Sequence, residues 1–232
     1  MAQCVRYQRQ DSVAAITMDD GKVNVISLSM ATELNAALDR AEAERAVVLL
    51  GGRDGVFSAG FDLSVLRSGG AEAVAMLRAG FELAERILSF PLPVVIACTG
   101  HAVAMGAFLL LSGDYRLGGA GGYRLTANEV AIGLTMPRTA VEILRQRLAP
   151  ASFNRAVTIA EPFSPANAVE AGFLDRVVPA AELDATARTI ATQLSALDMT
   201  AHAASKLRAR GQALGAIRTA IDADFSELRA VA

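Results

Sequence analysis

Apolar residues in the first half of the chain form short continuous or alternating runs, separated by longer stretches in which they recur at helical spacing. Met30, Leu34 and Leu38 repeat as on one face of a helix, and Ser29 is expected to cap that helix. Such alternation is typical of an α/β fold whose strands are covered on both faces. The expected strands are residues 5–7, 13–18, 47–50, 93–98 and 115–117, and the expected helices are residues 29–45, 71–89 and a short apolar helix after Gly106.

The second half of the chain has a different pattern. After Pro137 the sequence is Ala-rich and mostly helix-forming, with one strand-like break at residues 174–178. We therefore expect an α/β core over residues 1–180 and a helical region over residues 181–232. Ile190, Leu194 and Leu197 form an apolar helix face with little core left to cover, which favours a contact between subunits.

Composition excludes several classes of protein. The 232 residues are 53% hydrophobic and 20% charged, which is enough to bury a sizeable core and excludes a disordered chain. A formal net charge of -2 gives no broad basic field, so nucleic acid is not an expected partner. With two histidines and no Cys-x-x-Cys, no metal site is expected.

The location in the cell is inferred from the cysteines and the apolar runs. Cys4 and Cys98 lie far apart, and the first residues show no charged-then-apolar leader, so we expect a reducing cytoplasm. The longest nearly apolar run, residues 103–111, is too short to cross a bilayer, and no membrane span is expected.

The first candidate site segment, residues 56–63, follows a buried strand. Gly60 can adopt a backbone conformation closed to other residues, and Asp62 can cap the following helix. The backbone N–H groups around Phe61 would then point outward and could bind an anion. The alternative interpretation is a tight turn with a capping aspartate.

The second segment, residues 99–108, also runs from a strand end into a helix N-terminus. Ala104, Gly106 and Ala107 are small enough for a ligand, or simply another strand, to approach the backbone closely. Two such turns at one sheet edge could present a pair of N–H donors to a single oxygen. The alternative is close packing between helix and strand.

The third segment, residues 125–134, contains a lone carboxylate in an apolar stretch. Glu129 there is unusual unless it is paired, capping or functional. The structural alternative is a short helix capped by Thr126 or Asn128, with Glu129 in its first turn.

The order and spacing of these segments resemble the crotonase, or enoyl-CoA hydratase/isomerase, superfamily over nearly the whole chain. The matching residues are Asp20-Gly21-Lys22-Val23-Asn24-Val25, Phe57-Ser58-Ala59-Gly60-Phe61-Asp62-Leu63, the stretch from Pro93 to Gly106, Asn128-Glu129-x-x-Ile132-Gly133 and Ala168-x-x-Ala171-Gly172-Phe173-Leu174-Asp175-x-Val177-Val178.

The resemblance implies a spiral of strand–strand–helix turns with two roughly perpendicular sheets, followed by helices that drive trimers, often paired into hexamers. It implies that the N–H groups of Phe61 and Met105 form an oxyanion hole for a thioester carbonyl. Coenzyme A would enter as part of the substrate, with no separate cofactor. The residues implied to bind the acyl-CoA are Val23, Val25, Ala59, Gly60, Asp62, Leu63, Gly106 and Phe108.

Two departures from the family pattern bear on the reaction. Members that hydrate enoyl-CoA resemble one another in having two glutamates, whereas here Phe108 takes the first place and only Glu129 remains. Met105 stands where a glycine is usual, which implies a drier pocket. A single base suffices to move a double bond, so the favoured reaction is isomerisation of 3-enoyl-CoA to 2-enoyl-CoA. Hydration of 2-enoyl-CoA by Glu129 and an ordered water is the alternative.

Two other classes of function are compatible with parts of the sequence. A non-catalytic acyl-CoA-binding assembly subunit would keep the same turns, although an intact Glu129 argues against it. A serine hydrolase would use Ser58 with His101 and Asp62, but Val56 stands where the first glycine of Gly-x-Ser-x-Gly should be.

Several polar residues are expected to have ordinary structural roles. His101 is interpreted as a hydrogen-bonded turn histidine, and Tyr123 as a packing residue close to Glu129 in the fold. Lys206, Arg208 and Arg210 are expected to form a solvated helix face, although the family's C-terminal basic residues can reach a CoA phosphate.

Overall fold

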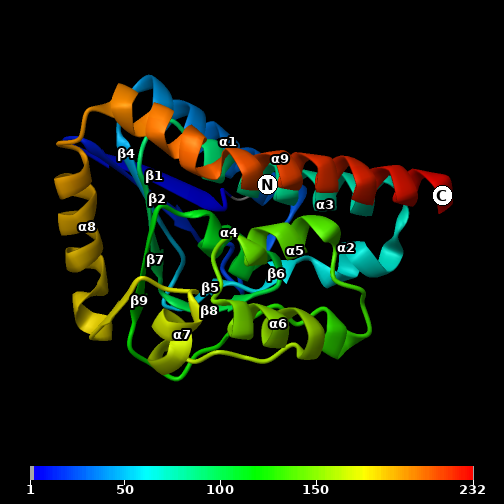
Figure 1. The fold of residues 1–232 in the computed structure, drawn as a ribbon. Helices are drawn as coiled ribbons and strands as arrows, with labels where there is room; N and C mark the ends of the chain where they lie inside the picture. The colour runs from blue at the N-terminus through cyan, green and yellow to red at the C-terminus, as the bar shows by residue number, and fades with distance from the viewer. Residues whose placement is uncertain (1–2, 232) are drawn as a thin grey trace.

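The computed structural model describes residues 3–231, with side chains up to residue 226; the first two residues of the expected leader-free start lie outside it. Its largest sheet has six strands in the order β1-β2-β4-β7-β9-β11 (Figure 1). β1 and β2 pair antiparallel, and every other pair is parallel. These strands are β1 (Val5–Gln10), β2 (Val13–Met18), β4 (Val47–Gly51), β7 (Val94–Cys98), β9 (Tyr115–Gly119) and β11 (Arg176–Val178).

Smaller sheets take the strands that come between these in the chain. A three-stranded sheet has the order β10-β8-β5, and a two-stranded sheet pairs β3 with β6. Because successive strands go alternately to the large and a small sheet before a helix returns the chain, the backbone forms the expected spiral of strand–strand–helix turns. The short strands are β3 (Val25–Ile26), β5 (Gly55–Ser58), β6 (Gly60–Phe61), β8 (Gly100–Val103) and β10 (Leu125–Thr126).

The expected helices are present with small shifts at their ends. The cap of the first helix lies two residues earlier than expected: Ser27, not Ser29, accepts a hydrogen bond from the Met30 N–H at 3.2 Å, and the helix begins at Leu28. The helices are α1 (Leu28–Ala43), α2 (Leu63–Ser68), α3 (Gly70–Ser89), α4 (Met105–Ser112), α5 (Arg138–Arg145), α6 (Pro150–Ile159), α7 (Pro165–Ala171), α8 (Leu183–Leu194) and α9 (Met199–Val231), with short 3-10 turns η1 (Val130–Ile132) and η2 (Ala180–Glu182).

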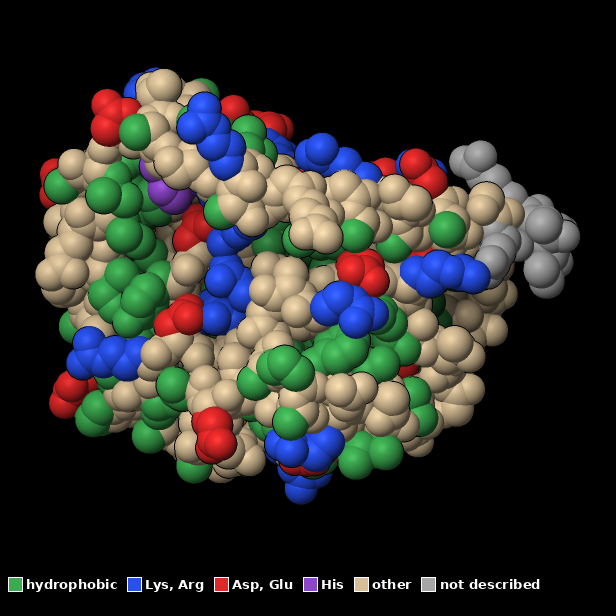
Figure 2. Space-filling view, in the orientation of Figure 1, with side chains coloured by type: hydrophobic (Ala, Val, Ile, Leu, Met, Phe, Trp, Pro, Cys, Tyr) green, Lys and Arg blue, Asp and Glu red, His purple; other side chains and the backbone are tan. Residues whose placement is uncertain are grey.

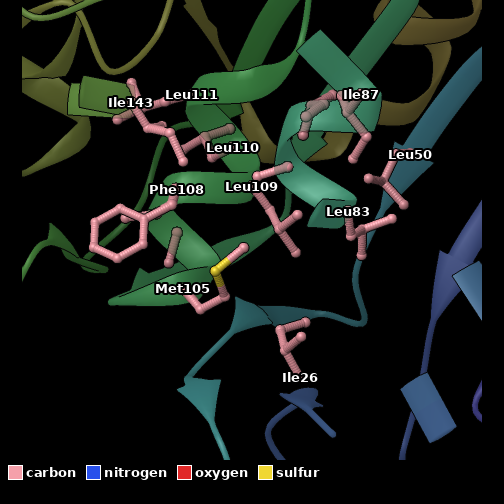
Figure 3. Packing of buried hydrophobic residues seen from close by; sticks show 14 of the residues in the cluster. Ile26, Leu50, Leu83, Ile87, Met105, Phe108, Leu109, Leu110, Leu111 and Ile143 are labelled. Atoms are coloured by element: carbon pink, nitrogen blue, oxygen red, sulfur yellow. The ribbon is translucent and has the colours of Figure 1, made fainter. Parts of the chain in front are cut away.

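α4 lies in the middle of the main core. All of its residues are buried, and α3 and α5 pack against it (Figure 3). This burial explains why the sequence of α4 is apolar on every side rather than on one stripe. The position of its N-terminus is therefore fixed by packing from all directions.

The C-terminal helices cover the core of their own chain. The long helix α9 runs along α3 and α5, and its Leu214, Ile217 and Phe225 join the main hydrophobic cluster (Figure 1). α8 packs on β4 and β7, where Ile190 and Leu194 contact a second cluster. The expectation that these two residues lack a core to cover is wrong, because the outer face of the large sheet provides one. Leu197 is exposed, as expected.

The proposed boundary near Ala180 falls at η2, between the last strand and α8. Within the part of the chain that the structure describes, no helix is both long enough and apolar enough to cross a membrane.

Candidate active site

The three segments singled out in the sequence meet at one edge of the small sheet. β5, β8 and β10 are mutually parallel, with β8 in the middle. Phe61, Met105 and Glu129 each follow the carboxyl end of one of these strands within a few residues. Since the carboxyl ends of parallel strands lie at the same edge of a sheet, residues from three distant parts of the chain converge there.

The first two turns touch through their backbones. Gly60 has φ +90°, and a Cβ atom added to it would lie 2.8 Å from the Val103 carbonyl oxygen and 3.3 Å from the Met105 nitrogen. Ala104, which precedes Met105, also has a positive φ of 50° without being a glycine. Strained backbone of this kind is concentrated at functional sites, where the surrounding structure holds it in place.

Buried side chains hold the Gly60 turn. The Asn24 amide donates to the carbonyls of Met18 (3.0 Å) and Phe57 (3.2 Å). Ser58 Oγ donates to the Asn24 carbonyl at 2.7 Å and accepts from the Gly60 N–H at 3.2 Å. The Ser58 hydroxyl is thus fully buried and committed to the turn, which leaves the hydrolase interpretation without a nucleophile.

The second turn carries the N-terminus of α4. The Ala104 N–H donates to the Thr126 carbonyl at 2.9 Å, which ties this turn to the third segment. The Ala104 carbonyl already accepts from the N–H groups of Ala107 and Phe108. Met105 is the first helical residue, so its N–H has no acceptor within the helix and lies at the positive end of the helix dipole.

Glu129 is a buried carboxyl group with an unsatisfied oxygen. Its exposed fraction is 7%, and Oε2 has no hydrogen-bond partner among the described residues. Burial raises the pKa of Glu129 to about 7, because an ionised carboxylate loses its hydration there. A group of this kind costs folding free energy, which favours a functional explanation for its presence.

The local structure at Glu129 differs from the expected cap. Glu129 itself is the residue preceding η1, and neither Thr126 nor Asn128 makes a capping bond to that turn. The Glu129 carbonyl instead accepts from the N–H groups of Ile132 (3.1 Å) and Leu134 (2.9 Å). The backbone of Glu129 is therefore anchored while its side chain carries no structural hydrogen bond at Oε2.

An aromatic row adjoins the two turns. The Phe61 and Phe81 rings lie 5.8 Å apart edge to face, and the Phe81 and Phe108 rings stack at 6.3 Å. Gly80 makes room for this row, because a Cβ atom there would collide with the Phe61 ring. Phe81 lies on α3, and its buried ring contacts both Phe61 and Phe108.

The residues implied to bind the acyl-CoA lie near the same turn. The Ala59 N–H donates to the Val23 carbonyl at 2.9 Å, and Val25 pairs with Gly60. Asp62 caps α2 as expected, accepting from the Ser64 N–H at 2.8 Å. Val23 and Leu63 are large apolar side chains left exposed beside this turn.

Gly106 and Phe108 are positioned by packing. A Cβ atom at Gly106 would overlap the Ser58 carbonyl, so this glycine allows α4 to approach β5 closely. Phe108 is 1% exposed and lies on α4 with Met105 (Figure 3). The packing interpretation is thus confirmed at Gly106, and the functional interpretation of the segment stays a prediction.

The remaining polar candidates lie apart from this edge. His101 Nδ1 accepts from the Arg124 N–H at 3.3 Å, in agreement with a turn histidine, and its ring contacts Tyr123 edge to face. The expectation that Lys206 and Arg210 lie on a solvated helix face is wrong, because both pair with Asp114 and Lys206 is buried. Among the described side chains, no group of three or more His, Cys, Asp or Glu could hold a metal ion.

Comparison of the sequence with known proteins shows the family to which the chain belongs. A model of the enoyl-CoA hydratase/isomerase family matches residues 8–227. The mitochondrial enoyl-CoA delta isomerase 1 of Homo sapiens is 32% identical over 218 residues, covering 91% of this chain and 72% of the human protein.

Two solved structures from Mycobacterium tuberculosis are also similar. A probable enoyl-CoA hydratase is 47% identical with a TM-score of 0.94, covering 97% of this chain and 95% of that chain. An apo enoyl-CoA isomerase is 46% identical with a TM-score of 0.94, covering 98% of this chain and 100% of that chain. The chain therefore belongs to the enoyl-CoA hydratase/isomerase family and is an enzyme of the crotonase superfamily, whose members act on acyl-CoA thioesters.

Proposed function

We propose that this enzyme converts 3-enoyl-CoA to 2-enoyl-CoA, with Glu129 as the one acid–base group. The observation that carries this proposal is the buried carboxyl of Glu129, whose Oε2 has no hydrogen-bond partner among the described residues, at the sheet edge where the Gly60 and Met105 turns meet. A carboxyl whose pKa is near 7 can both take and return a proton at neutral pH.

The reaction needs only one proton shuttle. The Glu129 carboxylate removes a proton from the α-carbon, and the electron pair of that C–H bond moves toward the thioester oxygen to give a dienolate. The protonated Glu129 then returns the proton to the γ-carbon, the electrons leave the oxygen, and the double bond forms between the α- and β-carbons. The atoms of substrate and product are the same, so no water or cofactor is consumed.

The negative charge that builds on the thioester oxygen requires hydrogen-bond donors. We assign this role to the main-chain N–H groups of Phe61 and Met105, supported by the contact between their turns and by the helix dipole of α4. One such donor is typically worth about 3–4 kcal/mol of transition-state stabilisation.

Hydration of 2-enoyl-CoA is the second candidate. It requires activation of a water and protonation of the α-carbon, work that two carboxylates share in hydratases of this family. Phe108, in the place of the first glutamate, is buried and stacked on Phe81. This aromatic environment favours the reaction that does not need a bound water.

The acyl-CoA is proposed to lie along Val23, Val25 and residues 59–63. Val23 and Leu63 are exposed at that turn and offer apolar surface to the adenine end. Substitution Leu63→Asp should therefore raise KM about tenfold and leave kcat nearly unchanged, because a charge there opposes the anionic coenzyme without reaching the reacting carbons.

The direct test measures both reactions on the same protein. Absorbance of the conjugated thioester rises during isomerisation and falls during hydration, so the two rates are read separately. We expect isomerisation to dominate, and Glu129→Gln to lower kcat at least 1,000-fold. Glu82→Gln, at an exposed surface pair with Arg78, is the control and should keep wild-type activity. Rapid hydration without isomerisation, or full activity of Glu129→Gln, would overturn the proposal.

A further inference from the structure

A cavity lies at the C-terminal end of α4, away from Met105. Its volume is about 520 Å³, and it is lined by the first half of α9, by Asp114 two residues after α4, and by the segment following α5. Figure 2 shows Lys and Arg side chains gathered in a hollow below α9. The lining residues used below are Asp114, Gln146, Arg147, His202, Lys206 and Arg210.

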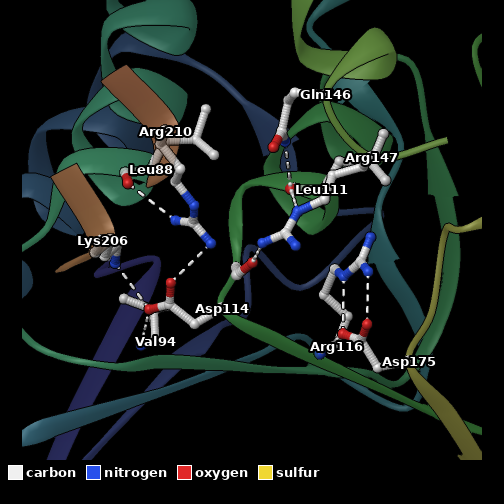
Figure 4. Close-up of polar contacts among 11 residues, drawn as sticks. Leu88, Val94, Leu111, Asp114, Arg116, Gln146, Arg147, Asp175, Lys206 and Arg210 are labelled. Carbon is white, nitrogen blue, oxygen red and sulfur yellow. Dashed lines mark hydrogen bonds and ion pairs between the residues drawn. The ribbon is translucent and has the colours of Figure 1, made fainter. Parts of the chain in front are cut away.

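Three cations in this cavity face a single carboxylate. Lys206 Nζ lies 2.7 Å from Asp114 Oδ2, and the Arg210 guanidinium lies 2.8 Å from Asp114 Oδ1 (Figure 4). Arg147 donates to the carbonyls of Leu111 and Gly113 and has no carboxylate within ion-pairing distance among the described residues. The side chains of Lys206 and Arg210 are only 4% and 14% exposed.

Helix ends account for only part of the excess positive charge. Arg210 donates to the Leu88 carbonyl at the end of α3, and Arg147 and Gln146 donate to the Leu111 carbonyl at the end of α4. Each helix C-terminus carries about half a negative charge. Together with Asp114 they supply about two negative charges against three positive ones, so roughly one positive charge is left facing the cavity.

Two further observations indicate that the polar groups lining the cavity are suited to an added anionic ligand. Nε2 of His202 is buried at the cavity and has no hydrogen-bond partner among the described residues. Burial lowers the pKa of Lys206 to about 8 and that of Arg147 to about 10, and in both cases neighbouring cations contribute to the lowering. The site therefore holds cations under mutual repulsion beside a buried imidazole nitrogen that has no hydrogen-bond partner among the described residues.

We propose that this cavity binds a compact oxyanion, a phosphate or carboxylate group, through His202, Lys206, Arg147 and Arg210. The volume accommodates such a group on a small molecule, and the lining offers N–H donors from α9 and from the loop after α5. The site is separated from the catalytic edge by the length of α4, and its existence does not depend on which reaction the enzyme performs.

The two histidines of the chain provide a direct test by NMR. The imidazole signals of His202 and His101 are followed while inorganic phosphate or malonate is added to the whole protein at constant pH, with sodium chloride holding ionic strength constant. We expect a saturable shift of His202 with millimolar affinity, and no shift of His101, which lies on β8. The phosphate and malonate arms show which oxyanion is preferred.

Matched variants on one helix test the assignment. Arg210→Gln should weaken binding at least fivefold, whereas Arg208→Gln, at an exposed position of α9 outside the cavity lining, should leave it unchanged. Because Arg210 also holds Asp114, His202→Ala provides a second variant that leaves that ion pair in place; calorimetry should show weaker binding there too.

Several results would overturn the proposal. These are the absence of a saturable shift, equal shifts of both histidines, or equal effects of the Arg208 and Arg210 variants. An unresponsive His202 together with a change of molecular mass in Arg210→Gln, measured by light scattering, would assign the cavity to an acidic side chain of a second copy of the chain instead.

Discussion

A methyl group placed on Gly60 would lie 3.3 Å from the backbone nitrogen of Met105, although the two residues are far apart in sequence. The same methyl would lie 2.8 Å from the Val103 carbonyl. The two turns are thus in contact through backbone atoms and the small Cβ of Ala104, which would lie 3.0 Å from the same methyl. Any change in one backbone must displace the other.

This contact predicts the effect of Gly60→Ala. The added Cβ collides with backbone at a positive φ, so the turns should separate and kcat/KM should fall at least 100-fold. Gly55→Ala is the matched control, because Gly55 has a similar φ of +78° but open space around the added atom. Equal losses of activity in the two variants would show that strain, not separation of the turns, is responsible.

Met105→Ala separates the role of the amide from that of the side chain. The N–H group is kept, so activity per folded molecule should stay within about tenfold of wild type. The buried side chain is lost, and unfolding by denaturant should show a destabilisation of about 2–5 kcal/mol. A 1,000-fold loss of kcat with unchanged stability would contradict the proposed main-chain role.

The raised pKa of Glu129 predicts the pH dependence of the rate. The base must be ionised to remove a proton, so kcat/KM should rise with pH and level off above an apparent pKa of about 7. Any activity that Glu129→Gln retains should lack this rise of kcat/KM with pH. A profile that is already flat at pH 5 would mean that Glu129 is not the base.

The same pKa predicts a change in stability. Glu129 titrates at about 7 when folded and near 4.5 when unfolded, so the folded state loses stability as pH rises through this interval. Glu129→Gln removes the penalty and should be more stable than wild type above pH 7 by about 3 kcal/mol, at about 1.4 kcal/mol per pKa unit. Thermal unfolding at pH 4.5 and pH 8 should show the difference only at the higher pH.

Asp114 should be essential for stability. Replacing it by Asn leaves Lys206 and Arg210 without their carboxylate in a mostly buried site, at an expected cost of about 3–5 kcal/mol. Asp184→Asn, which breaks an exposed pair with Arg188, should cost less than about 1 kcal/mol. Similar denaturation midpoints for both variants would show that the buried cluster adds little to stability.

The sequence predicted most of what positions the proposed site. Strand runs, the need for glycine at position 60 and the lone carboxylate at 129 are local signals, and parallel strands bring such turns to one sheet edge. The alternative that a side chain caps a short helix at Glu129 is wrong. The turn there is held by the Glu129 carbonyl instead of by a side-chain cap.

Other parts of the molecule could not be predicted this way because their partners are distant. Lys206 looked like one of several basic residues on a helix surface, but its partner Asp114 is 92 residues earlier in the chain. Phe81 lies within the helix expected over residues 71–89, yet its stacking with Phe108 depends on how α3 and α4 pack against each other. Periodicity gives the face of a helix, whereas the residue opposite it comes only from tertiary packing.

The enclosure of α4 restricts how this enzyme can evolve. A helix with no side open to water has no position where substitutions accumulate harmlessly, and the proposed catalytic amide belongs to its first residue. A substitution within residues 105–112 would change both the packing of the core and the position of that amide. New substrate preferences are therefore more easily acquired through the exposed side chains of Val23 and Leu63 than through the helix that carries the amide.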